Sequence, residues 1–194
     1  MNEQKKYEFT GEIKTIFGIE FKQIRAIVNF GCVVAGEIGG WIESEENLNQ
    51  SGNAWVYGNA EVSGNARVSG NARVYGNAEV YGNARVYGNA EVYGNAMVSG
   101  NARVYGNAWV SGDASVKKDD DYMIIGGAGR YNRFTTFFKC RDKTIKVICG
   151  CFFGTIIEFR AKVKETHKGN KHEKVYLAMA DMAELQIGND EVEK

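Results

Sequence analysis

The sequence predicts a mainly β protein whose central part is a coil of short parallel strands. Three observations support this fold class. Eleven hexads of the form [S/Y]-G-[N/D]-A-x-V run without interruption from Ser51 to Val116. In each hexad, Ala and Val alternate with x and Tyr or Ser, as in a strand with one inward and one outward face. A six-residue period is also too short for a helical repeat, which needs at least ~20 residues.

The Gly-Asn pair is expected to divide the repeat into sides. Glycine adopts a positive φ at little cost, and asparagine is one of the few other residues that does so. Each hexad should therefore form one short strand and one corner. Three such sides close a triangular coil of eighteen residues, with Val in the interior and Ala at narrow corners. Successive coils would stack about 4.8 Å apart.

The flanks divide the chain into three predicted segments: 1–50, 51–116 and 117–194. The first is expected to hold a β-hairpin that turns at Phe17-Gly18, followed by an irregular capping coil. Ile42 and Leu48 precede Ala54 by twelve and six residues, so they should continue its inward position. Trp41 is expected to cover the open end of the coil.

The last segment predicts a small α+β unit. After Val116, the run KKDDD is interpreted as a solvated exit from the repeat. Strands are expected at 122–127, 134–140 and 144–154. A helix at 155–167 should begin with a capping box formed by its first and fourth residues, Thr and Glu. A second helix at 171–187 should carry an apolar stripe made of Val175, Met179, Met182 and Leu185.

The repeated V-Y-G-N-A-x resembles the hexapeptide-repeat, left-handed parallel β-helix superfamily. The left-handed sense is taken from this resemblance. The flanks, YEFTGEIKTIFGIEFKQIRAIVNFG and FTTFFKCRDKTIKVICGCFFGTIIEFRAKVKETH, resemble uncharacterised bacterial and prophage proteins, some of which are labelled transferases. The resemblance covers nearly the whole chain. It implies a homo-oligomer, with a trimer favoured, and a protein of phage or prophage type.

Composition limits the partners. Lys plus Arg and Asp plus Glu are 24 each, so no net charge attracts nucleic acid or a membrane. We see no apolar leader at the N-terminus and no run near the ~20 residues of a membrane span. Four cysteines without an export signal indicate free thiols in a reducing compartment. We therefore expect a cytoplasmic protein, in the host cell if a phage encodes it.

With eighteen residues per turn, the variable position falls into three columns. The first column holds Trp55, Arg73, Glu91 and Trp109. The second column holds Glu61, Glu79, Met97 and Ser115. The third column holds Arg67, Arg85 and Arg103, with Ser69, Tyr87 and Tyr105 two residues further on.

Three interpretations of the arginine column stay open. It is a solvated face that keeps flat strands from aggregating. It is an interface, in which the arginines meet Glu61 and Glu79 of a neighbouring protomer. Or it binds a phosphate-bearing, nucleotide-like ligand, for which guanidinium forks and tyrosine rings are suited. A second candidate anion site follows Gly126, Gly127 and Gly129, where Arg130 and Arg133 come next.

Catalytic groups are sparse. Hexapeptide acyltransferases use a histidine beside an acyl-donor cleft, but the only histidines here, His167 and His172, lie where the two predicted helices meet. Cys149 and Cys151 are expected on one side of a strand, and their spacing matches no zinc motif. We predict no metal and no cofactor. We expect a non-enzymatic, oligomeric binding protein that sequesters or blocks a host factor or a nucleotide-like anion. The alternatives are an acyltransferase-like enzyme and a passive scaffold.

Overall fold

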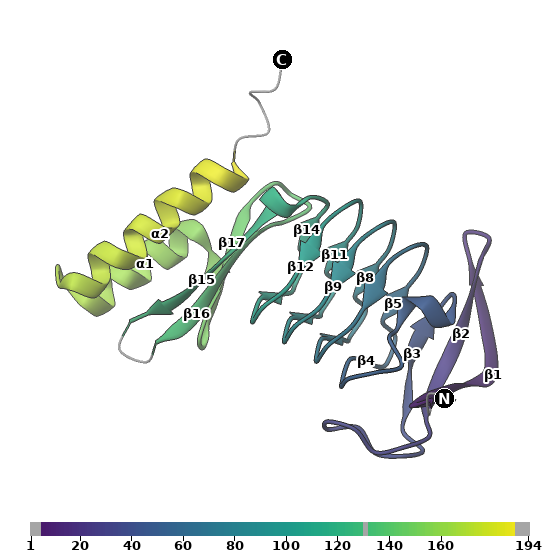
Figure 1. Cartoon of the computed structure of the whole chain (residues 1–194). Helices are drawn as coiled ribbons and strands as arrows, with labels where there is room; N and C mark the ends of the chain where they lie inside the picture. The colour runs from purple at the N-terminus through teal and green to yellow at the C-terminus, as the bar shows by residue number, and fades with distance from the viewer. Residues whose placement is uncertain (1–4, 130–131, 189–194) are drawn as a thin grey trace.

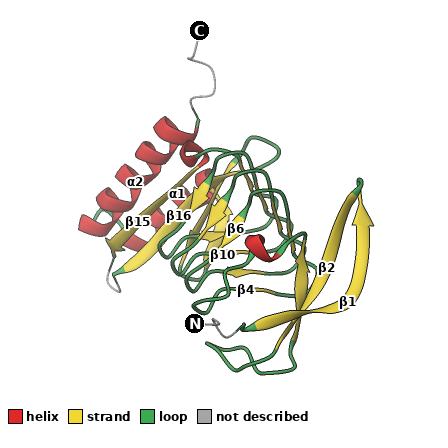
Figure 2. Ribbon diagram, turned by 45° about the vertical axis from the view of Figure 1, so that its right-hand side comes forward, coloured by secondary structure: helices red, strands yellow, loops and turns green. Residues whose placement is uncertain are grey.

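The computed structural model describes residues 5–129 and 132–188 and shows an elongated molecule in three sections (Figures 1 and 2). A β-hairpin lies at one end, a stack of coils in the middle, and a sheet with two helices at the other end. The first elements are β1 (Tyr7–Ile16), β2 (Ile19–Ala26), β3 (Ile38–Ile42) and the 3₁₀ turn η1 (Glu45–Asn47). The predicted mainly β fold class is confirmed.

Eleven two-residue strands form the coils, one for each hexad. They are β4 (Trp55–Val56), β5 (Glu61–Val62), β6 (Arg67–Val68), β7 (Arg73–Val74), β8 (Glu79–Val80), β9 (Arg85–Val86), β10 (Glu91–Val92), β11 (Met97–Val98), β12 (Arg103–Val104), β13 (Trp109–Val110) and β14 (Ser115–Val116). One wall contains β4, β7, β10 and β13, and a second contains β6, β9 and β12. The third contains β5, β8, β11 and β14, and β3, β2 and β1 extend it.

The parallel pairs between hexads join residues eighteen apart, so the predicted length of one turn is confirmed. The Ala and Val side chains of all eleven hexads are at most 1% exposed. Between coils, the N–H of Arg73 donates to the Ala90 carbonyl (2.9 Å) and the N–H of Asn77 to the Gly94 carbonyl (2.8 Å). This pattern recurs in the other hexads. It leaves unpaired carbonyls at the first coil and unpaired N–H groups at the last.

The corners explain why glycine and asparagine recur. Each hexad glycine has a φ between 58° and 75°. A Cβ on Gly88 would lie 3.0 Å from the backbone nitrogen of Gly106 in the next coil, so a side chain would both strain the turn and separate the coils. The asparagines form ladders in which the Asn53 amide donates to Asn71 (3.0 Å), and Asn71 donates to Asn89 (2.9 Å).

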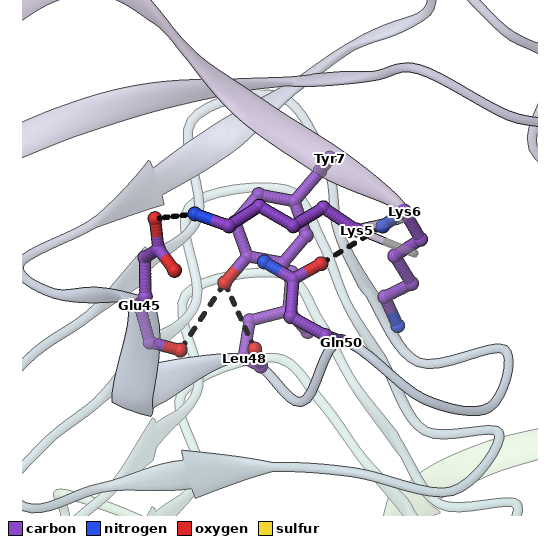
Figure 3. Close-up of polar contacts among 6 residues, drawn as sticks. All are labelled: Lys5, Lys6, Tyr7, Glu45, Leu48 and Gln50. Carbon is purple, nitrogen blue, oxygen red and sulfur yellow. Dashed lines mark hydrogen bonds and ion pairs between the residues drawn. The ribbon is translucent and has the colours of Figure 1, made fainter. Parts of the chain in front are cut away.

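Side chains of the N-terminal segment pair with the carbonyls of the first coil (Figure 3). The Tyr7 hydroxyl donates to the carbonyls of Leu48 (2.9 Å) and Glu45 (3.2 Å). Lys6 is 4% exposed, and its ammonium donates to the Ala54 carbonyl at 2.8 Å. Burial lowers the pKa of Lys6 to about 8. Burial also raises the pKa of Tyr7.

The first coil departs from the predicted spacing. Ile42 pairs with Val62, and Leu48 forms a bridge with Val68. Each partner is twenty residues further on, because two extra residues precede the first regular corner. Both side chains are buried, as expected, but they occupy the valine position of the coil rather than the alanine position that we predicted.

The aromatic side chain buried at this end is not the predicted one. Trp41 lies on the outer face of β3, where the Lys14 ammonium is 4.4 Å from its ring centroid. Trp55 is fully buried instead. The rings of Tyr7 and Phe30 cover Trp55 edge-on, at centroid distances of 6.1 and 5.4 Å. The hairpin therefore buries a side chain that would face solvent in the other hexads.

The C-terminal section is an antiparallel sheet with a pair of helices. Its elements are β15 (Tyr122–Ala128), β16 (Arg133–Lys139), β17 (Ile145–Cys149), β18 (Phe152–Thr155), α1 (Ile156–His167) and α2 (Lys171–Ile187). Phe138 and Ile148 belong to the core of the coil, whereas Phe137 and Val147 pack with the helices. One face of this sheet therefore closes the last coil, and the other face holds the helices (Figure 1).

Two predictions for this section were wrong in detail. The single strand expected at 144–154 is two strands, because Gly150 turns the chain with a φ of 61°. The apolar stripe of α2 is shifted: Met182 and Leu185 are 56% and 68% exposed. The buried face carries small residues, which allow α2 to lie close to the sheet. It consists of Tyr176, Met179, Ala180, Ala183 and Ile187.

The first helix agrees with the prediction. Its capping box is present, with the Thr155 hydroxyl accepting the Glu158 N–H at 3.2 Å and the Glu158 carboxylate accepting the Thr155 N–H at 2.7 Å. Among the described residues, neither α1 nor α2 combines the length and the apolar character needed to cross a bilayer.

Candidate functional site

The outward arginines of β6, β9 and β12 form one continuous surface, which we call the arginine wall. It consists of Arg67, Arg85 and Arg103, all exposed and stacked in register. Beside them, the rings of Tyr87 and Tyr105 are stacked at 5.3 Å between centroids and 14° between planes. The structure therefore brings together the five predicted site residues that lie in the coil.

A groove of about 790 Å³ runs along the arginine wall. The three arginines line it together with Tyr87, Ser69 and the segment around η1. Two carboxylates, Glu45 and Glu46, stand at the end nearest the N-terminal cap. The Glu45 carboxylate is ion-paired with Lys5 at 2.7 Å, so among the described residues Glu46 supplies the remaining negative charge at this end, which sequence analysis did not predict.

The arginine at the opposite end has a carboxylate partner. Arg103 forms an ion pair with Asp119, whose side chain also accepts the Arg103 backbone N–H at 2.8 Å. This contact holds the pKa of Asp119 below its usual value and raises that of Arg103. Asp119 opens a second 3₁₀ turn, η2 (Asp119–Asp121), in which Asp121 is buried. The interpretation of KKDDD as a solvated exit was therefore wrong for Asp119 and Asp121, whereas Lys117, Lys118 and Asp120 are exposed.

The other two arginines keep their charge uncompensated. Within residues 5–129 and 132–188, no carboxylate lies within ion-pairing distance of Arg67 or Arg85. Unit charges ~4 Å apart repel by ~1 kcal/mol in bulk water and by more near a protein surface. An anion placed between the two guanidiniums would relieve this repulsion, and their planar forks suit an oxyanion.

The second predicted anion site does not join the first. Arg130 lies outside the described residues. Arg133 lies against Gly150 and lines a different hollow, of about 770 Å³, together with Trp109 and Cys151. The glycine-rich stretch before it belongs partly to β15, where Gly127 has a φ of 76°.

Three of the four thiols and both imidazoles are spread over the C-terminal section, and the fourth thiol, of Cys32, is exposed near the other end of the chain. Cys149 ends β17 and accepts a hydrogen bond from the Thr135 hydroxyl at 3.2 Å, whereas Cys151 is exposed in the following turn. The prediction that these two cysteines lie in one strand was therefore wrong. The His167 ring stacks on Tyr176 at 5.4 Å. In the part of the chain that the structure describes, no three His, Cys, Asp or Glu side chains are grouped so that they could hold a metal.

A triangular coil of two-residue strands, one for each hexad, defines a β-solenoid of the hexapeptide-repeat class, and the repeats fit that β-helix family. The model of the YdcK β-solenoid repeat matches residues 60–76, 66–82, 78–92, 90–104, 97–112 and 102–117. An Escherichia coli (strain K12) protein described as "Uncharacterized acetyltransferase YdcK" is 43% identical over 51 residues. That alignment covers 26% of this chain and 15% of the E. coli protein.

Proposed function

We propose that this protein is a non-enzymatic binding protein that holds a nucleotide-like, phosphate-bearing anion in the groove along the arginine wall. The proposal rests on Arg67 and Arg85. Their exposed guanidiniums lie on adjacent coils, and no carboxylate lies near them among the described residues. A phosphate between them would accept forked hydrogen bonds from both.

The rest of the groove supports one orientation of such a ligand. Tyr87 lines the groove, and the Tyr87–Tyr105 stack offers aromatic surface for a planar group. The Glu45 carboxylate is already paired with Lys5, so Glu46 is the carboxylate that repels phosphate and accepts hydrogen bonds from hydroxyl or amino groups. We therefore place the phosphate near Arg85 and the uncharged, donor-bearing part of the ligand toward η1.

The alternative, in which the arginine wall contacts Glu61 and Glu79 of a neighbouring protomer, is less well supported. Glu61 already forms an ion pair with Lys14 at 2.7 Å in the same chain. The other glutamate expected to meet the arginine wall of a second copy is Glu79, which forms no ion pair among the described residues. A homo-oligomer, with the trimer first, stays a proposal, and light scattering of the purified protein would test it.

The biological role that we propose is sequestration. A protein that binds a nucleotide without converting it lowers the free concentration of that nucleotide. The resemblance of both flanks to prophage proteins suggests a host nucleotide signal as the ligand, and interference with host defence as the outcome. This role depends on the binding activity and is tested through it.

The test is a thermal-shift and calorimetric titration with inorganic phosphate, ATP and cyclic dinucleotides. We expect at least one nucleotide to stabilise the native protein and to bind more weakly as salt rises. The variant Arg67→Gln/Arg85→Gln should lose this binding. Arg73→Gln is the matched control, because Arg73 occupies the same hexad position on another wall, 4.0 Å from Glu91. Equal binding by both variants would contradict the proposal.

An acyltransferase is the second candidate function, because the E. coli protein that resembles the repeats is described as an acetyltransferase. This candidate predicts that acetyl-CoA stabilises the protein and that CoA is released in the presence of an amine or alcohol acceptor. The hexads themselves contain no histidine to act as the base. Stabilisation by nucleotides without stabilisation by acetyl-CoA would exclude it.

A further inference from the structure

The N-terminal hairpin extends beyond the sheet to which it belongs. The pairing of β2 with β3 begins at Lys22, which lies opposite Ile42. Residues 19–21 of β2 are therefore paired with β1 on one side only, among the described residues. Figure 2 shows the hairpin leaving the body of the molecule at this point. The backbone of this short edge is open to another strand.

The tip of the hairpin is unusually apolar and strained. Phe17 is fully exposed and has a φ of 50°, in the left-handed region. Two-residue turns of this kind favour Asn-Gly, because asparagine adopts positive φ far more readily than an aromatic residue does. Ile13 and Ile19 are also exposed. Within residues 5–129 and 132–188, no contact accounts for a strained, solvent-facing phenylalanine, whereas contact with a partner would.

A cleft of about 520 Å³ separates the hairpin from the wall of β5 and β8. The hairpin side of the cleft is apolar and is formed by Ile16, Phe17, Ile19 and Phe21. The opposite side carries three carboxylates, from Glu43, Glu61 and Glu79. In the part of the chain that the structure describes, the one ammonium in contact with them is that of Lys14, 2.7 Å from Glu61, so negative charge remains in excess.

We propose that this cleft binds an extended, cationic segment of a partner protein, which adds a strand to the open edge of β2. In an extended segment, alternate side chains point to opposite sides. Phe21 pairs with Lys14, which contacts Glu61, and Glu61 pairs with Glu79, so the apolar and the acidic side chains of the cleft project from one face of the sheet. The side chains of the segment on that face would therefore include apolar residues that pack on Ile19 and lysines or arginines that face Glu79. Backbone hydrogen bonds give affinity in this mode, and this set of side chains gives specificity. The site lies on a different wall from the arginine wall and is independent of anion binding there.

The test is selection of peptides from a library of displayed random dodecapeptides on the purified full-length protein. We expect enrichment of sequences in which every second position carries either Lys or Arg or one of Val, Ile, Phe and Tyr, with both kinds present. Synthetic peptides of the selected sequences are then titrated by fluorescence anisotropy. The variant Phe17→Asn should weaken binding at least tenfold, and it should fold, because asparagine suits this turn. Glu79→Gln should weaken binding severalfold.

The matched control is Glu165→Gln, which removes an exposed carboxylate from α1, paired with Lys162, without touching the cleft. This variant should bind as tightly as the native protein. Three outcomes would overturn the proposal: no peptide is selected, the selected peptides are acidic or uncharged, or Phe17→Asn leaves the affinity unchanged. A change of oligomeric mass in Phe17→Asn would also overturn it, because the occupant would then be a second copy of the chain.

Discussion

The two ends of the coil are built on the same plan but with opposite hydrogen-bonding chemistry. Each end carries a 3₁₀ turn of three residues, η1 before the first regular corner and η2 after the last hexad. The third residue of each turn is buried, and its side-chain oxygen accepts the N–H of the residue before the turn. The distance is 2.8 Å from Ser44 to Asn47 and 3.1 Å from Lys118 to Asp121.

The difference lies in what each end offers to the neighbouring coil. At the first coil the side chains donate: the Asn47 amide to the carbonyls of Gly64 (3.0 Å) and Ala66 (2.9 Å), and the Lys6 ammonium to that of Ala54. At the last coil most of these side chains accept, although the Tyr122 hydroxyl donates to the Arg103 carbonyl at 2.7 Å. Asp119 accepts the Arg103 N–H, and the Thr136 hydroxyl accepts the Trp109 N–H at 3.1 Å.

This contrast follows from the direction of the bonds between coils. Because most of the bonds between coils run from the N–H groups of one coil to the carbonyls of the next, acceptors predominate at the first end of the stack and donors at the last. A buried backbone group without a partner costs about as much as a lost hydrogen bond. The caps are therefore specific to their ends, and exchanging their chemistry should show this.

The largest expected effect comes from Asn47→Asp. The new carboxylate would face the Gly64 and Ala66 carbonyls in place of a donor, in a fully buried position. We expect a loss of about 3–5 kcal/mol of unfolding free energy at pH 7, measured by urea denaturation. Asn59→Asp, on an exposed ladder position, is the control and should cost far less. A small effect at Asn47 would mean that the cap does not depend on donors.

A second prediction concerns Lys6 and pH. Its pKa is about 8 in the folded protein and near 10.5 in the unfolded chain. Between these values the unfolded chain holds a proton that the folded protein has released, so stability should rise with pH. We expect a gain of about 1 kcal/mol from this group between pH 7 and 9. Lys6→Met should remove the gain when both proteins are unfolded in urea at each pH, whereas Lys5→Met, at an exposed ion pair, should keep it.

Tyr7→Phe should destabilise the protein less than Asn47→Asp does, also through lost hydrogen bonds to carbonyls at the first coil. It removes the hydrogen bonds to the Leu48 and Glu45 carbonyls and leaves the ring on Trp55. We expect a loss of about 1–2 kcal/mol, measured by thermal or urea unfolding. Tyr81→Phe, whose hydroxyl makes no hydrogen bond that the described structure shows, is the control. Equal losses in the two variants would show that the hydroxyl of Tyr7 has no special role.

The smallest effect on stability is expected for Asp119→Asn at the other end. The amide oxygen can still accept the Arg103 N–H, so the melting temperature should change little. The ion pair with the Arg103 guanidinium would be lost, which adds a third uncompensated charge to the groove. We expect the affinity for phosphate-bearing ligands to rise about two- to fivefold, in line with exposed ion pairs. Unchanged affinity, measured by calorimetry, would mean that Arg103 takes no part.

The period of the repeat was enough to predict the coil. Eighteen-residue stacking, the buried Ala and Val, and the three outward columns all follow from alternation and from glycine at the corners. The irregular ends of the coil were predicted less accurately than its regular part. The two additional residues before Ser51 shifted Ile42 and Leu48 to the valine position, and nothing local in the sequence marks that insertion.

The candidate site was partly predictable for the same reason. Residues eighteen apart must meet, so Arg67, Arg85 and Arg103 could be placed on one wall. The contact between Asp119 and Arg103 spans sixteen residues, which breaks the period. The acidic end formed by Glu45 and Glu46 depends on how the capping coil folds. A run of aspartates that begins three residues after the last hexad was the one available signal, since the last coil needs acceptors.

Because each coil makes the same bonds to the coil before it and the coil after it, the length of the stack can change in steps of one complete turn. Deleting or duplicating eighteen consecutive hexad residues leaves every remaining coil with neighbours of its own kind, and both caps still find the coil ends that they fit. Each unit changes the length of the arginine wall by one step of about 4.8 Å. Unequal recombination within the repeated DNA could thus lengthen or shorten the groove while leaving the rest of the molecule intact.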